Sequence, residues 1–131
     1  MNKYVLVSLG ALMMSTAALA QEVMTTIPAN SVTVTHWLHQ NVYDPDNNKV
    51  GDIEDVLLSE TGQVSAVILG AGGFLDIGDH NVAVPFNSIT QTTKDGKVSL
   101  TLDKAITKDA LKNAPGLKYD SNTMSWGPES K

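Results

Sequence analysis

Four oxygen-bearing side chains stand at the spacing of a calcium-binding loop. They are Asp44, Asp46, Asn48 and Asp55, at positions one, three, five and twelve of such a loop. Calcium binds through oxygen ligands of this kind. Lys49 opposes the interpretation, because the loop requires glycine there, and Asp55 replaces the usual bidentate glutamate. The sequence leaves two hypotheses: a cation or small-ligand site in the turn from Asp44 to Asp55, or a polar hairpin turn.

A second acidic group follows the turn and consists of Asp52, Glu54 and Asp55. Alternation along a strand places Asp52 and Glu54 on one face, where two carboxylates could act as acid and base. No nearby motif supplies a nucleophile or an oxyanion hole, and no serine has a G-x-S-x-G context. We therefore predict no catalytic residue, no cofactor and no enzyme activity. The acidic face is predicted to be solvated or to contact a basic partner.

Composition narrows the classes of partner. The chain has 131 residues and a formal net charge of −5, which is typical of one acidic domain. It contains no arginine and no cysteine. An acidic surface without arginine repels a polyanion, so nucleic acid is not an expected partner. Without cysteine the fold has no disulfide and no thiolate metal site, and packing alone must hold it together.

Residues 1–20 have the pattern of a secretory signal peptide. Lys3 gives a positive start, residues 5–17 are mainly apolar, and Ala18, Leu19 and Ala20 form a small-residue cleavage site. The alternative is a membrane anchor, but the apolar run falls short of the ~20 residues that span a bilayer. We expect cleavage before Gln21, no stable membrane insertion afterwards, and a periplasmic or secreted protein.

The elements that must position these residues are mostly strands. Residues 21–36 form a predicted N-terminal arm, in which 31–38 alternate like a strand or extended segment. Further strands are predicted at 41–44, 49–58, 64–69, 82–86, 90–93 and 97–103. A bulge at Gly51–Asp52 would explain the broken alternation of the second of these. Thr107 is expected to cap one short helix, and residues 116–131 are predicted to form a loosely ordered tail around Trp126.

One strand and the loop after it suggest an interface. Residues 64–69 are almost entirely apolar, which predicts that both faces of that strand are covered. The glycine-rich loop that follows could present two large apolar side chains to a partner or plug its own domain. The interface candidates are Val67, Leu69, Gly72, Gly73, Phe74 and Leu75.

Three segments resemble the PRC-barrel domain of small exported bacterial proteins. They are VYDPDNNKVGDIEDVLL, GQVSAVILGAGGFLDIGDHNVAVPF and TKDALKNAP. The resemblance covers residues 37–115 and implies an all-β fold, a small, strongly bent antiparallel β-barrel of about six strands with one short C-terminal helix. It also implies a non-enzymatic module for protein interaction or assembly in the bacterial envelope. The partner is expected to be a protein, and a second copy in a homodimer is one candidate.

Overall fold

The computed structural model describes residues 22–72 and 80–129. The chain divides into two units, residues 1–31 and residues 32–131. In the first unit the described residues contain no helix or strand. They include a turn in which the Ser31 hydroxyl donates to the Pro28 carbonyl at 2.5 Å. In the described part of the chain, no helix has the length and apolar character needed to cross a membrane.

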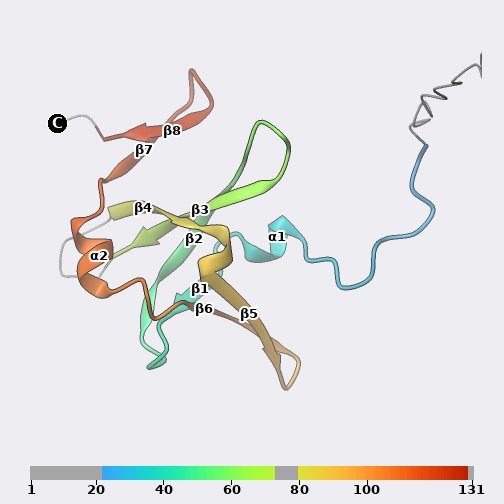
Figure 1. Cartoon of the computed structure of the whole chain (residues 1–131), viewed down its shortest axis with the longest axis horizontal. Helices are drawn as coiled ribbons and strands as arrows, with labels where there is room; N and C mark the ends of the chain where they lie inside the picture. The colour runs from blue at the N-terminus through green and yellow to red at the C-terminus, as the bar shows by residue number, and fades with distance from the viewer. Residues whose placement is uncertain (1–21, 73–79, 130–131) are drawn as a thin grey trace, which may run out of the picture. The chain divides into compact units, whose positions relative to one another are not determined.

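The described residues of the second unit form a six-stranded sheet, a separate two-stranded hairpin and three short helical turns (Figure 1). The sheet contains β1 (Asn41–Tyr43), β2 (Lys49–Leu58), β3 (Val64–Ala71), β4 (His80–Pro85), β5 (Ile89–Lys94) and β6 (Lys97–Leu102). The hairpin contains β7 (Leu117–Asp120) and β8 (Ser125–Pro128). The helical turns are α1 (Val34–Trp37), the 3-10 turn η1 (Phe86–Ser88) and α2 (Lys108–Asn113). The predicted all-β class with a short C-terminal helix is confirmed.

The order of strands in the sheet is β4-β3-β2-β1-β6-β5. The two edge strands, β4 and β5, are therefore consecutive in the chain and are joined only by η1. A connection of three residues keeps the two edges close, so the sheet must curl strongly. Among the described residues β4 and β5 do not pair, and the curled sheet stays open at this seam. The expectation of antiparallel pairing throughout is wrong at one place, because β1 pairs with β6 in parallel.

Two irregularities explain the mixed pattern of β2. Its register against β1 skips Val50, and its register against β3 skips Glu54. The extra residue at Glu54 shifts the phase, so that Ile53 and Val56 both face the core. The bulge predicted at Gly51–Asp52 is therefore displaced to the neighbouring Val50, and the second bulge, at Glu54, was not predicted.

The core lies on the inner face of the curled sheet. β3 contributes Val67, Leu69 and Ala71, and α2 closes the cluster with Leu111. Ile68 points to the other face of β3 and is also fully buried. The prediction that both faces of residues 64–69 are covered is thus confirmed for residues 67–69, whereas Val64 and Ser65 are exposed.

A strand or extended segment at 31–38 is a wrong prediction, because α1 occupies the middle of it. The Thr33 hydroxyl caps this turn by accepting from the His36 amide at 3.2 Å. Trp37, at the end of α1, is buried and stacks on Phe86 with ring centroids 5.0 Å apart. Capping and aromatic burial therefore override the alternating pattern. Residues 32–36 of the predicted arm belong to the second unit.

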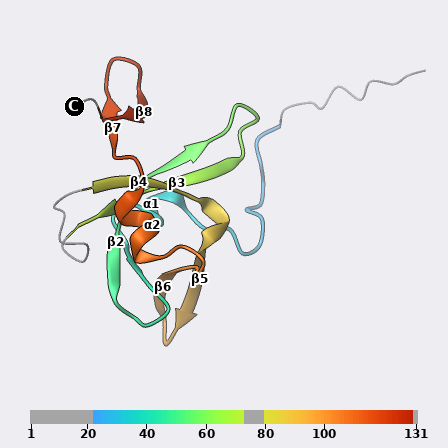
Figure 2. The same ribbon diagram turned by 60° about the vertical axis from the view of Figure 1, so that its left-hand side comes forward.

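The predicted loose tail is wrong for residues 117–128, which form the β7–β8 hairpin. Figure 2 shows this hairpin beyond β4, on the side away from the β5–β6 hairpin. Tyr119 and Trp126 face each other across the two strands with ring centroids 5.6 Å apart. Cross-strand aromatic pairs of this kind stabilise short hairpins, and the alternation is too brief to be recognised in the sequence.

The close approach of β2 to β3 makes Gly51 a test of the fold. A Cβ at Gly51 would collide with the carbonyl oxygen of Gly70, a backbone atom that cannot move aside. Gly51→Ala is expected to lower the free energy of unfolding by about 2 kcal/mol or more, measured by urea denaturation. Gly127→Ala is the matched control, since a Cβ there meets nothing within 4 Å. Equal midpoints for the two variants would contradict the tight contact.

Candidate interaction surfaces

The turn between β1 and β2 is closed by its own polar groups. The Asp44 carboxylate accepts from the Asn48 backbone amide at 2.8 Å, and its second oxygen accepts from the Asn48 side chain at 3.4 Å. Asn47 adopts a positive φ of 66°, which asparagine tolerates better than most residues. The acidic residue at the start of the turn thus acts as a turn former.

Asp55 lies far from this turn. It stands six residues beyond Lys49 along β2, which corresponds to about 20 Å of extended chain. One of its oxygens accepts from the Trp126 indole N–H at 2.8 Å, and the other accepts from the amide of Val56 at 2.8 Å. Asp44 and Asp55 therefore do not converge. The structure therefore does not bring Asp44, Asp46, Asn48 and Asp55 together as the calcium-loop hypothesis requires, and the described residues include no group of three His, Cys, Asp or Glu side chains that could hold a metal ion.

The bond to Trp126 attaches the C-terminal hairpin to the outer face of the sheet. Asp55 lies opposite Ile68 in the register of β2 and β3, so the two side chains share this face. Ile68 is fully buried yet lies outside the core cluster. The indole that binds Asp55 must therefore lie on the face that Ile68 occupies, and the hairpin contributes to covering it.

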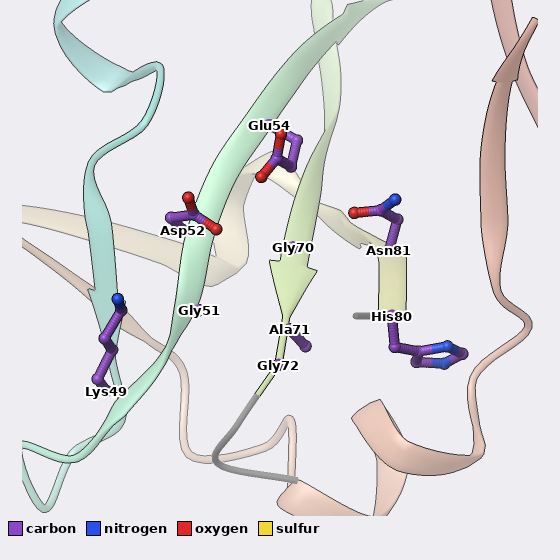
Figure 3. A pocket seen from close by; sticks show the side chains of 9 residues that line it. All are labelled: Lys49, Gly51, Asp52, Glu54, Gly70, Ala71, Gly72, His80 and Asn81. Atoms are coloured by element: carbon purple, nitrogen blue, oxygen red, sulfur yellow. The ribbon is translucent and has the colours of Figure 1, made fainter. Parts of the chain in front are cut away.

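Asp52 and Glu54 converge over β3 in an open cleft (Figure 3). A Cβ at Gly70 would lie 2.8 Å from a Glu54 carboxylate oxygen and 3.0 Å from one of Asp52. The missing side chain at Gly70 is what gives both carboxylates room. The two carboxylates share one face of β2, as alternation predicted for this pair. Asn81 is opposite Gly70 on β4 and adds an amide to the cleft.

His80 borders the same cleft but points away from the carboxylates (Figure 3). Its Nε2 atom lies 2.8 Å from the Ala114 carbonyl oxygen. Because a carbonyl only accepts, Nε2 must carry the proton in this contact. His80 therefore connects the start of β4 to the C-terminal end of α2. The cleft therefore offers two carboxylates, the ammonium group of Lys49 and the amide of Asn81, a set that suits a polar or charged ligand.

The interface candidates from the sequence have different outcomes. Val67 and Leu69 are fully buried in the core, so the prediction that they form a contact surface is wrong. Ile68 occupies the second face that was assigned to them. Gly72 lines the acidic cleft. Gly73, Phe74 and Leu75 lie outside the described residues.

Sequence reasoning missed an apolar groove beside α1. It encloses about 140 Å³ and lies between α1, β2, β3, η1 and β5. Its lining residues are uncharged: Val32, Thr33, Val34, Trp37, Val56, Val64, Phe86 and Gln91. Val32 and Val34 are about half exposed, at 49% and 51%. The alternation of Val32 and Val34 was the only sign of this groove in the sequence. In a strand, such alternation predicts one buried face and does not predict an open groove.

The floor of the groove is held in place by two contacts of Trp37. Its ring stacks on Phe86, and its indole N–H donates to the Gln91 side chain at 2.6 Å. A buried indole usually needs such a partner, and Gln91 satisfies it from β5. The groove thus has a fixed base and a rim of exposed aliphatic side chains, which include Val64 and, next to it in the register, Leu58.

A comparison with known families gives one match for this chain. Residues 30–105, more than half of the sequence, match the family model described as PRC-barrel domain. The match begins earlier and ends earlier than the predicted boundaries of 37 and 115. It includes α1 and all six strands of the sheet, while α2 and the β7–β8 hairpin follow it. No curated protein matches the chain.

The bond between Trp126 and Asp55 predicts the behaviour of the hairpin. Trp126→Phe keeps an aromatic ring but removes the donor, so the hairpin should open more often. A loss of about 1 kcal/mol would speed amide hydrogen exchange in residues 117–128 about fivefold. Tyr119→Phe is the control, because it preserves both rings and the bond. Unchanged exchange in the Trp126 variant would mean that the bond does not hold the hairpin.

The separation of Asp55 from the turn predicts the response to calcium. A ligand that binds only the native state raises the melting midpoint. Because the oxygen ligands of the proposed loop do not converge, we expect no specific effect of calcium. The melting midpoint in millimolar calcium should equal the midpoint in sodium chloride at the same ionic strength. A rise that Asp44→Asn abolishes would show that the turn binds the ion after all.

Proposed function

This chain belongs to the PRC-barrel family, and we propose that it is an exported, non-enzymatic module that binds a protein partner in the bacterial envelope. The single observation that carries the proposal is the apolar groove beside α1. Soluble domains bury apolar side chains where they can, and a gathered, partly exposed set is typical of a contact surface. Here the core is filled on the inner face, while Val32, Val34, Val64 and Leu58 stay partly exposed.

The remaining surface supports binding better than catalysis. The cleft that Asp52 and Glu54 line also holds Lys49 and Asn81, and His80, the only histidine near it among the described residues, is turned towards α2. None of the described residues that line this cleft is a serine, threonine, cysteine or tyrosine, so the two carboxylates have no side-chain nucleophile beside them to activate. The negative net charge of the chain favours its solubility when no partner covers the apolar groove.

The export part of the proposal rests on residues 1–20, whose charged start, apolar run and small-residue end are those of a signal peptide. The absence of cysteine is compatible with this location, because the packed sheet needs no disulfide. A periplasmic site of action places the partner in the envelope.

A size measurement on native extracts tests this proposal. The tagged chain, released from the envelope at its natural level, should migrate in a complex larger than the free chain. Val34→Asp puts a charge on the groove rim and should shift most of the protein to the size of the free chain, because an unpaired charge is costly in an apolar contact. Val23→Asp is the matched control, since Val23 is exposed and does not line the groove.

Two results would contradict the proposal. One is wild-type protein that migrates only as the free chain or remains in the cytoplasmic fraction. The other is a complex that Val34→Asp leaves intact while both variants melt at the wild-type temperature.

A further inference from the structure

The apolar groove lies next to an unpaired strand edge. β5 is an outer strand of the sheet and, within the described part of the chain, pairs only with β6. Gln91 belongs to β5 and also lines the groove, where it accepts from Trp37. The open seam of the curled sheet therefore combines two features in one place: free backbone hydrogen-bonding groups and an apolar depression.

The register shows which backbone groups of β5 are free. Asp95 and Gly96 form a two-residue turn with positive φ angles of 53° and 76°, so Lys94 and Lys97 form a hydrogen-bonded pair next to it. Hydrogen-bonded pairs then recur at every second residue along the antiparallel ladder. The N–H and C=O groups of Gln91 and Thr93 consequently face away from β6, and the described residues offer them no backbone partner.

The groove suits one side chain at a time. A cavity of about 150 Å³ lined by apolar groups can hold a molecule the size of benzene, and this groove encloses about 140 Å³. None of its lining residues is charged. It therefore favours a single leucine-sized or phenylalanine-sized group and disfavours a charged one.

The size of the groove argues against a second copy of the chain as the occupant. A stable interface between two folded proteins uses about 20–30 residues on each side, whereas eight residues line this groove. An extended peptide needs much less surface, because part of its affinity comes from main-chain hydrogen bonds to a strand edge.

We propose that β5 and the apolar groove together bind an extended segment of the partner, which adds as a strand beside β5 and inserts one bulky apolar side chain against Trp37. This inference deepens the proposed function and rests on it. The backbone of the segment pairs with Gln91 and Thr93. Since strand side chains alternate between faces, the segment should carry its apolar residues at every second position.

A defined peptide tests the inference. The probe is a nine-residue peptide with alternating serine and leucine between two terminal lysines, titrated into the full isotope-labelled chain. Chemical shifts should move for the Trp37 indole and for the amides of Gln91 and Thr93. Replacing the leucines by alanine should weaken binding at least tenfold, because the buried apolar area is lost. N-methylation of the peptide nitrogens that face β5 should do the same, while N-methylation of the alternate set should have little effect.

A variant of the chain provides the reciprocal test. Thr93→Pro removes one outward donor without removing a bond to β6, a position at which edge strands tolerate proline. It should weaken peptide binding about tenfold, and Thr93→Val, which keeps the donor, should not. If Thr93→Pro lowers the melting midpoint strongly, the N-methylated peptides still decide the question.

The outcomes separate this inference from the proposed function. A native complex that survives in Thr93→Pro, with no shifts at Gln91 and Thr93 up to millimolar peptide, overturns the strand-addition inference and leaves a protein-binding module. Shifts at these residues without any complex in the envelope support the peptide site and overturn the envelope partnership. Concentration-dependent dimerisation that alters the same signals would identify a second copy as the occupant and overturn the inference.

Discussion

The shortness of η1 is the constraint on which the rest of the structure depends. Three residues join β4 to β5, the two outer strands of a six-stranded sheet. Such a sheet cannot lie flat, because its edges would then stand about five strand spacings of ~4.8 Å apart. The curl is made possible by the skipped residues in β2 and by the glycine contact between Gly51 and Gly70. Inside the curl, apolar residues at alternate positions form one core without disulfides.

The edges of the curled sheet do not pair with each other. Segments outside the sheet therefore cover apolar residues that the sheet alone would leave exposed. α1 packs Trp37 against Phe86 and Gln91 near the seam, and α2 adds Leu111 to the core. On the outer face, Trp126 of the hairpin binds Asp55 across 71 residues of sequence. Each addition is held by one aromatic or aliphatic residue and few polar contacts. The sheet and its core therefore share many contacts, whereas α1, α2 and the β7–β8 hairpin are each attached to them by few contacts.

The strands were predictable because apolar and polar side chains alternate along them or form short apolar runs. The Lys49–Leu58 strand has the bounds that the sequence predicts, and the helix capped by Thr107 forms as expected. α1 was not predictable, since Val32 and Val34 fit the period of a strand while Val34 and Trp37 fit the i, i+3 spacing of a helix. Only the tertiary position of Phe86 decides between the two. The role of Asp55 was also hidden: sequence spacing placed it in a calcium loop, and only the hairpin supplies the Trp126 partner. Alternation assigned Val67 and Leu69 to a surface, whereas the core takes them and leaves Ile68 on the outer face.

The parallel pairing of β1 with β6 affects how the chain acquires its structure. β1 has three residues and lies between β2 and β6, so its outer partner is a segment almost sixty positions later. Pairings between segments so distant in sequence form late, because a long loop must close before they gain any energy. A nascent polypeptide of this kind holds an unfinished sheet until its last third has been synthesised. Such a delay fits the proposed export, because an unfinished sheet passes through a narrow translocation pore more readily than a compact domain does.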